Sequence, residues 1–276
     1  MALCSTCPRG CLVASGMLGA CRSRRGGDTC VEPEGYGRIT SLALDPIEKK
    51  PIACWRPGTT VLSLGGYGCN MRCPFCQNAS IAQAGPDDVP WRTVTPEWVV
   101  RQALELAEHD CIGIAYTYNE PLVNWEFLRD TGELAHKAGL VNVLVSNGMA
   151  NSAVISQVAP LVDAANIDLK CFTDAGYRSL GGHLSTVMHT IETLAALPTC
   201  HLEVTTLVVP GLSDDDAQVE AMARWLASLD ASIPYHLSRF FPRHRMADAA
   251  PTSLHTMRHL RDVASRHLPT VLLGNM

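Results

Sequence analysis

The chain has 276 residues, 47% of them hydrophobic and 18% charged, with a formal net charge of −5 and a pI of about 6.0. This length supports a sizeable core in one large domain or two modest ones, and the mild acidity argues against non-specific binding to nucleic acid or anionic membranes. No run approaches the ~18 apolar residues of a membrane span.

Composition and periodicity divide the chain into an irregular module, 1–58, and a regular unit, 59–276. The module is rich in Cys, Gly, Pro and Arg and lacks periodicity. In the second unit, short apolar runs typical of strands alternate with amphipathic stretches typical of helices. The predicted strands lie at 61–66, 111–117, 141–148, 164–170, 201–211 and 233–240. The predicted helices lie at 95–109 and 122–138, after 148, from Ser213, and near 251–266, before a last apolar run at 270–274.

This alternation predicts right-handed βαβ units and a parallel sheet, which is an α/β fold. Six units are fewer than the eight of a closed TIM barrel, so we expect an open or partial (β/α)6 TIM-like barrel with its chemistry at the carboxyl ends of the strands. Polar residues follow successive strands, as this rule predicts. They are Cys69, Thr117 to Glu120, Ser146 and Asn147, Asp168 and Lys170, Pro210 and Gly211, and His236.

Twelve cysteines are the most informative feature of the composition. No export signal is recognisable, because the apolar run 12–20 is broken by glycines and precedes its arginines, so we expect a cytoplasmic protein. In a reducing compartment, clustered cysteines indicate metal or redox chemistry rather than disulfides.

Three cysteines, Cys69, Cys73 and Cys76, crowd the segment GCNMRCPFCQN that follows the first predicted strand. A structural zinc site wants four protein ligands, usually as two separated pairs. Three thiolates on a 4Fe–4S cluster leave one iron open for a substrate, and this is the interpretation we prefer to three incidental core thiols.

The C-x3-C-x2-C spacing, with Phe75 before the last cysteine, resembles the signature of the radical SAM superfamily. That resemblance implies that the open iron binds the amino and carboxylate groups of S-adenosylmethionine (SAM). One electron from the reduced cluster then gives methionine and a 5′-deoxyadenosyl radical, which abstracts hydrogen from a substrate.

Further motifs resemble the pyruvate formate-lyase activating enzymes. TYNEP has Asn119 where that group has a second glycine, and DLK, VVPGLSDDD and PYH occur in the same order. The resemblance makes Glu120 an acceptor for the SAM amino group, Lys170 a partner for its carboxylate, and His236 a contact near its ribose. The full set of expected cofactor-binding residues is Phe75, Gln77, Asn119, Glu120, Ser146, Asn147, Asp168, Lys170 and His236.

A resemblance over almost the whole chain is to the radical SAM proteins of the AmmeMemoRadiSam system, carried by YGRITSLALDPIEKKP, SNGM, NIDLK and LLGNM. The chain departs from that pattern at Cys54, where the family usually has histidine, and at GNM, where relatives commonly continue into a cysteine-bearing tail. The resemblance favours a lid over the active site for DPIEKKP. By charge alone, its Asp45, Glu48, Lys49 and Lys50 form a solvated turn equally well.

The N-terminal segment CSTCPRGC supplies Cys4, Cys7 and Cys11, with Cys21 and Cys30 further on. A C-x2-C-x3-C group with one distant cysteine, here Cys21, fills four positions of either an auxiliary 4Fe–4S cluster or a structural zinc site, while free thiols or a redox pair are the alternative. Of the rest, we expect Cys111, Cys171 and Cys200 to be buried small hydrophobes, with a catalytic thiol at Cys171 as the alternative.

The predicted function is reductive cleavage of SAM followed by hydrogen abstraction. One candidate substrate is a glycine of a partner glycyl-radical enzyme, and the other is a small molecule or peptide. An electron donor such as flavodoxin or ferredoxin is then required. A non-enzymatic iron–sulfur electron carrier is the alternative from another class, although it leaves TYNEP, DLK and PYH unexplained.

Overall fold

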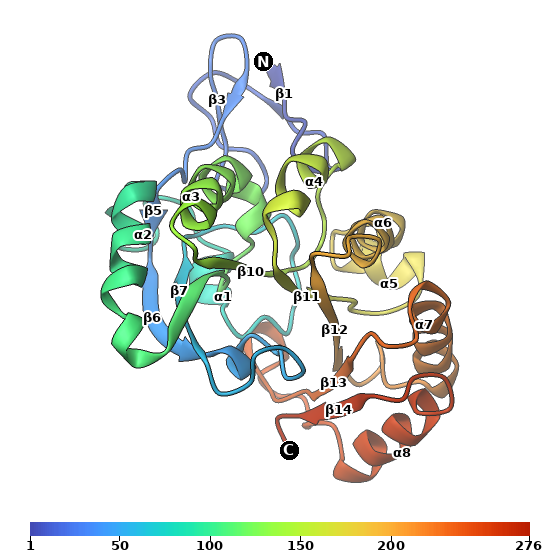
Figure 1. Cartoon of the computed structure of the whole chain (residues 1–276). Coiled ribbons are helices and arrows are strands. Elements are labelled where there is room, and N and C mark those ends of the chain that lie inside the picture. The colour runs from blue at the N-terminus through green and yellow to red at the C-terminus, as the bar shows by residue number, and fades with distance from the viewer.

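The computed structural model describes residues 1–276, and its centre is an eight-stranded sheet (Figure 1). In spatial order the strands are β14 (Val271–Gly274), β13 (Tyr235–Arg239), β12 (His201–Val208), β11 (Ala164–Asp168), β10 (Val141–Ser146), β9 (Cys111–Tyr116), β7 (Thr60–Gly65) and β6 (Ser41–Pro46). Every neighbouring pair from β7 to β14 is parallel, and β6 is antiparallel to β7. The α/β fold is therefore confirmed, and the last apolar run adds one more parallel strand to the six expected.

The longer helices lie outside the curved sheet (Figure 1). They are α2 (Pro96–Glu105), α3 (Trp125–Lys137), α4 (Ser152–Val158), α5 (Asp174–Ser179), α6 (Leu184–Ala195), α7 (Asp216–Leu229) and α8 (Leu254–Ala264), and the short α1 (Ala79–Ala82) follows β7. Short 3-10 turns are η1 (Ile47–Lys49), η2 (Ala107–His109), η3 (Pro121–Asn124), η4 (Ala159–Leu161) and η5 (His244–Met246). None of these helices is both long and apolar enough to cross a lipid bilayer.

Local capping explains where two of these helices begin. The Thr95 side chain accepts the backbone N–H of Trp98, and Pro96 occupies the first position of α2, as its sequence predicts. The helix expected from Ser213 begins instead at Asp216, because Asp215 caps it by accepting from the N–H of Ala217. The Ser213 hydroxyl is used in the preceding turn, where it donates to the carbonyl of Leu207.

The segment between β6 and β7 closes one end of the barrel. Ile47 and Ile52 from this segment pack inside against Val61, Ala115 and Val143. Because the segment leads into the first residue of β7, it lies at the amino ends of the parallel strands, opposite the loops that follow them. The expectation of a lid over the active site is therefore wrong in position, and DPIEKKP forms part of a floor.

The first forty residues form a small extension with two hairpins, at the top of Figure 1. Strand β1 (Ala2–Leu3) pairs with β2 (Leu12–Val13), and β3 (Arg25–Gly26) pairs with β4 (Val31–Glu32). A third ribbon joins β5 (Arg38–Ile39) to β8 (Arg92–Thr93). The rest of the expected module, up to residue 58, supplies β6 and the barrel floor.

Candidate metal and cofactor site

The loop after β7 brings the three predicted metal ligands to the carboxyl end of the sheet. Cys69, Cys73 and Cys76 are free thiols that line one cavity of about 790 Å³ inside the barrel. The loop begins at Gly68, which has φ +86°, and a Cβ there would lie 2.4 Å from the carbonyl oxygen of Cys21. Only glycine allows this close approach, so the loop's position depends on it.

The surroundings of the three thiols set their protonation. Burial raises the pKa of Cys69 strongly, raises that of Cys73 to about 11, and raises that of Cys76, while the nearby Lys170 opposes the shift at all three. The thiols are therefore protonated at neutral pH when no metal is bound, and metal binding would release those protons. The N–H of Met71 and the amide of Asn147 donate to Cys69 Sγ over 3.4 and 3.5 Å, and such bonds favour the thiolate.

The donor set fits a cluster better than a single ion. No group of three or more His, Cys, Asp or Glu side chains is arranged to hold one metal ion. Three thiols on one loop line a cavity that extends well beyond them, which leaves room for a 4Fe–4S cube with one iron free for another ligand.

Glu120 presents a buried carboxylate beside the thiols. It follows β9, is only 2% exposed, and accepts hydrogen bonds from Leu122 N at 3.0 Å, Ser146 Oγ at 2.7 Å and Asn147 N at 2.8 Å. Burial raises its pKa to about 7, although these three donors oppose the shift. A cationic or N–H donor group in the cavity would restore its charge at neutral pH.

The neighbouring Asn119 ties its strand end to the cysteine loop. Its Oδ1 accepts from Gly66 N at 2.9 Å, and its Nδ2 donates to the carbonyls of Tyr67 at 3.0 Å and Gly68 at 3.1 Å. The preceding Tyr118 has φ +71°, a strained conformation for a bulky residue that this connection holds in place. Asn119 therefore positions the loop directly, whatever it contacts in a bound cofactor.

Asp168 and Lys170 form an ion pair of 2.9 Å where β11 ends. Burial lowers the pKa of Lys170, but Asp168 and the thiol of Cys73 together have a larger, opposite effect. The pKa of Lys170 is therefore raised, and its ammonium stays charged. One face of the cavity thus carries a cation within electrostatic range of all three thiols, which suits an anionic ligand or a thiolate-bound cluster.

Eight of the nine expected cofactor-binding residues line this cavity. They are Phe75, Gln77, Asn119, Glu120, Ser146, Asn147, Asp168 and Lys170. The exception, His236 on β13, is buried and bonds through Nε2 to Glu203, and it does not line the cavity. Its contact with a ribose stays a prediction. Pro210 and Gly211 also lie outside the lining.

The floor of the cavity carries polar residues that sequence analysis did not assign to the site. Asp45 accepts from Lys50 Nζ at 2.8 Å, Lys49 Nζ at 3.0 Å and Tyr118 Oη at 2.5 Å. Lys50 is 3% exposed and lies 4.7 Å from the centre of the Tyr118 ring. The signals in the sequence were the charge of DPIEKKP, which also fits a solvated turn, and the family resemblance, which favours a lid over the active site.

The remaining cysteines separate by burial. Cys4, Cys7 and Cys21 are buried, Cys11 is half-buried, and Cys30 and Cys54 are exposed. Cys111 and Cys171 are buried as expected, while Cys200 is half-buried. Cys171 packs against Gly176 and does not line the cavity, which argues against the alternative of a catalytic thiol.

The sequence profile described as "Radical SAM superfamily" matches residues 63–226. The "Uncharacterized protein MJ0808" of Methanocaldococcus jannaschii is 37% identical over 275 residues, which are 99% of this chain and 81% of that protein. The "Pyruvate formate-lyase 1-activating enzyme" of Escherichia coli K12 is 26% identical over 179 residues, 61% of this chain and 71% of the enzyme.

Solved structures share the fold at low sequence identity. QueE from Escherichia coli superposes with a TM-score of 0.57 at 13% identity, covering 87% of this chain and 94% of its own. A radical SAM methyltransferase from Sphaerobacter thermophilus gives a TM-score of 0.59 at 18% identity, covering 80% and 68%. At these identities the similarity concerns the fold alone.

Proposed function

The chain belongs to the radical SAM superfamily, and we propose that it cleaves SAM reductively and directs the resulting radical to a hydrogen atom of a substrate. The observation that carries the proposal is the convergence of Cys69, Cys73 and Cys76 with Glu120 and Lys170 on one cavity. When bound, a 4Fe–4S cluster and SAM supply the one-electron cleavage to methionine and a 5′-deoxyadenosyl radical.

The chain's own residues bind the cluster, orient SAM and shield the reacting centre from water. The three cysteines hold the cluster, Glu120 accepts from the SAM amino group, and Lys170 pairs with the SAM carboxylate. Ser146 and Asn147 keep the Glu120 carboxylate aimed into the cavity through bonds of 2.7 and 2.8 Å. The floor formed by Ile47 and Ile52 closes the far end, which limits access of water to the reacting centre.

The motifs YGRITSLALDPIEKKP, SNGM, NIDLK and LLGNM support a finer placement in the AmmeMemoRadiSam group. The 26% identity with an activating enzyme supports one substrate class, a backbone glycine of a partner glycyl-radical enzyme. Either substrate requires a reductant, and a flavodoxin or ferredoxin is the class of protein that delivers single electrons.

The cavity floor favours a second candidate substrate, an acidic small molecule or peptide end. Lys49, Lys50 and Asp45 together carry one net positive charge, and Lys50 Nζ uses one of its three donors on Asp45. The hydroxyl of Thr205 lines the same cavity and has no hydrogen-bond partner. Unused buried donors near a net cation suit a carboxylate that enters the barrel.

The first experiment is anaerobic cluster reconstitution, then dithionite and SAM, with 5′-deoxyadenosine measured beside a Cys73→Ala control. Product from the wild type alone supports radical SAM chemistry. A reconstituted cluster that gives no product, and whose EPR signal is unchanged by SAM, supports the electron-carrier alternative.

The substrate class is tested by adding fractions of a cell extract to the active enzyme. Stimulation by an acidic low-molecular-weight fraction, lost in Lys50→Met and kept in the matched control Lys137→Met, supports the acidic substrate, because Lys50 is buried at the cavity floor and Lys137 is exposed on α3, outside the cavity lining. Stimulation by the protein fraction alone, with an organic radical in the EPR spectrum, supports the glycyl-radical partner.

A further inference from the structure

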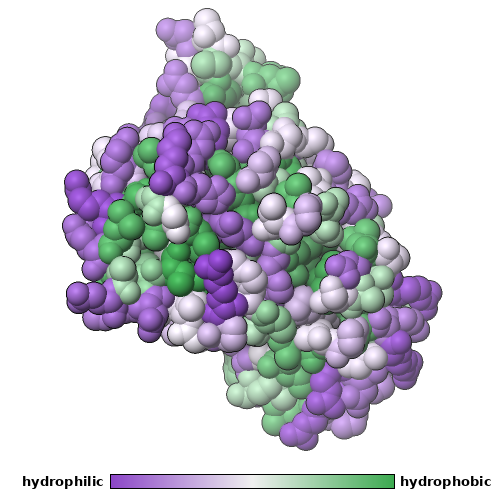
Figure 2. Space-filling model, viewed as in Figure 1, coloured by the Kyte–Doolittle hydropathy of each residue, from purple (hydrophilic) through white to green (hydrophobic).

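The N-terminal extension buries Cys4, Cys7 and Cys21 and exposes its large apolar side chains. Its buried apolar residues before residue 39 are Ala2, Cys4, Cys7, Val13 and Cys21. In contrast, Leu3, Leu12 and Met17 are 65%, 67% and 63% exposed, and apolar surface appears at this end of the molecule in Figure 2. A segment this small, with cysteines for most of its core and no disulfide, lacks the apolar burial that folds such a module without a metal.

The backbone gathers four of these cysteines. The β1–β2 ladder continues with Cys4 N donating to the Cys11 carbonyl at 2.8 Å, and a turn closed by Gly10 N and the Cys7 carbonyl reverses the chain between them. Cys21 lies within electrostatic range of both Cys4 and Cys7, and Cys7 within range of Cys11. Cys30, in the same module, is exposed and outside this group.

Burial raises the pKa of Cys7 and Cys21, and the backbone N–H groups of Arg9 and Ser23, two residues after each cysteine, oppose that shift. In the catalytic loop, Met71 N donates to Cys69 Sγ from the corresponding position. Such donors stabilise thiolates and tune iron–sulfur clusters. Four thiolates suit either one zinc ion or a 4Fe–4S cluster, and no group of three or more His, Cys, Asp or Glu side chains is arranged to hold a single ion.

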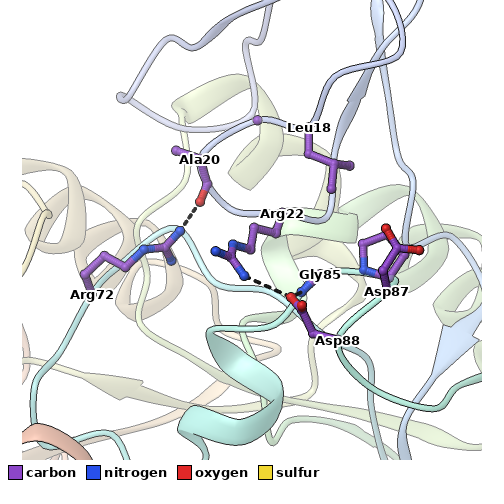
Figure 3. A pocket seen from close by; sticks show the side chains of 9 residues that line it. Leu18, Ala20, Arg22, Arg72, Gly85, Asp87 and Asp88 are labelled. Carbon is purple, nitrogen blue, oxygen red and sulfur yellow. Dashed lines mark hydrogen bonds and ion pairs between the residues drawn. The ribbon is translucent and has the colours of Figure 1, made fainter.

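The cysteine group adjoins the catalytic loop. Asn70 connects the two groups of cysteines: its backbone carbonyl accepts from Arg9 Nε at 2.7 Å, and its Oδ1 accepts from Asn147 Nδ2 at 2.9 Å. Arg9 lies two residues after Cys7, and Asn147 also donates to Cys69 Sγ. Arg72 lies in electrostatic range of both Cys69 and Cys21, and Figure 3 shows its guanidinium reaching the carbonyl of Ala20. Nearby, Arg22 of the N-terminal extension forms a salt bridge of 2.9 Å with Asp88, which follows the catalytic loop in the chain.

We propose that Cys4, Cys7, Cys11 and Cys21 bind a second iron–sulfur cluster, separated from the catalytic loop by the side chains of Asn70 and Arg72. This goes beyond the proposed function, because the site holds metal independently of SAM cleavage. Four protein thiolates fill every position of such a cluster, so it takes no substrate. Its place behind Cys69 makes it a neighbour of the catalytic cluster.

The test uses the full chain with Cys69, Cys73 and Cys76 all changed to Ala, which removes the catalytic site and leaves the N-terminal cysteines intact. After anaerobic reconstitution, this variant is expected to bind about four iron and about four sulfide, against about eight of each in the wild type. Adding Cys21→Ala to the variant is expected to abolish or strongly reduce the remaining iron. Cys30→Ala is the matched control, and adding it to the triple variant instead is expected to leave the iron content unchanged.

A variant that lacks the three catalytic cysteines and binds no iron would overturn the proposal, as would one zinc per chain without sulfide. A spectroscopic readout is independent of activity. In the reduced wild type, two neighbouring paramagnetic clusters are expected to give an EPR spectrum that differs from the sum of the two single-cluster spectra. Failure of SAM cleavage would count against the proposed function and leave these iron counts unaffected.

Discussion

The barrel floor depends on one buried carboxylate, that of Glu203 on β12. It is fully buried and accepts from Ala53 N at 3.1 Å, Cys54 N at 2.8 Å, His201 Nε2 at 2.9 Å and His236 Nε2. These bonds fasten the floor segment to the sheet, so we expect Glu203→Gln to destabilise the fold.

The magnitude follows from the pKa of this carboxyl. Burial alone would raise it, but the bonds from His201 and His236 dominate and lower the pKa from 4.5 to about 2. A depressed pKa of a carboxyl stabilises the folded state above the unfolded pKa, and the contribution is lost as pH falls through the folded value. A shift of this size corresponds to about 3 kcal/mol at neutral pH and to less than half of that near pH 3.

The measurement is the free energy of unfolding of the metal-free, reduced protein in urea at pH 7 and near pH 3. The free energy of unfolding of Glu203→Gln is expected to be about 3 kcal/mol lower than that of the wild type at pH 7. This difference in stability is expected to be smaller near pH 3. Glu220→Gln is the matched control, because Glu220 also bonds a histidine, His267, but lies at the surface and should show little change. Equal stabilities of wild type and Glu203→Gln at pH 7, or a gap that is the same at both pH values, would refute the reasoning.

Three further outcomes are expected. Since Glu120 has a pKa of about 7 and accepts best when ionised, SAM affinity measured by calorimetry on the cluster-bound protein should rise from pH 6 to pH 8 more steeply in the wild type than in Glu120→Gln; parallel profiles would contradict its role. Lys170→Met should weaken SAM binding by about 10- to 100-fold through loss of a charged hydrogen bond, while Lys137→Met, at an exposed site on α3, should not. Cys171→Ala should leave iron content and 5′-deoxyadenosine formation unchanged, and loss of product would restore the alternative of a catalytic thiol.

The spacing of the cysteines and the periodicity of apolar residues were sufficient to predict the features of this protein that depend on local sequence. The alternation of strands and helices predicted the parallel α/β sheet, because each pattern reports the face that an element buries. The C-x3-C-x2-C loop and the residues after each strand were predicted to meet, and the cavity includes eight of the nine expected cofactor residues, because parallel strands place their carboxyl ends at one edge.

Only the tertiary structure decided which side of the barrel the floor segment occupies and what it does there. DPIEKKP reads equally as a solvated turn or a lid, and its place follows from the antiparallel pairing of β6 with β7, which is a long-range property. Likewise, Lys50 is buried because Asp45 and Tyr118 surround it, and His236 is withdrawn from the cavity because Glu203 binds its ring. The sequence by itself determined the elements and the chemistry of the loop, whereas contacts between distant residues determined which polar groups face the cavity, since burial and pairing arise only when the chain packs.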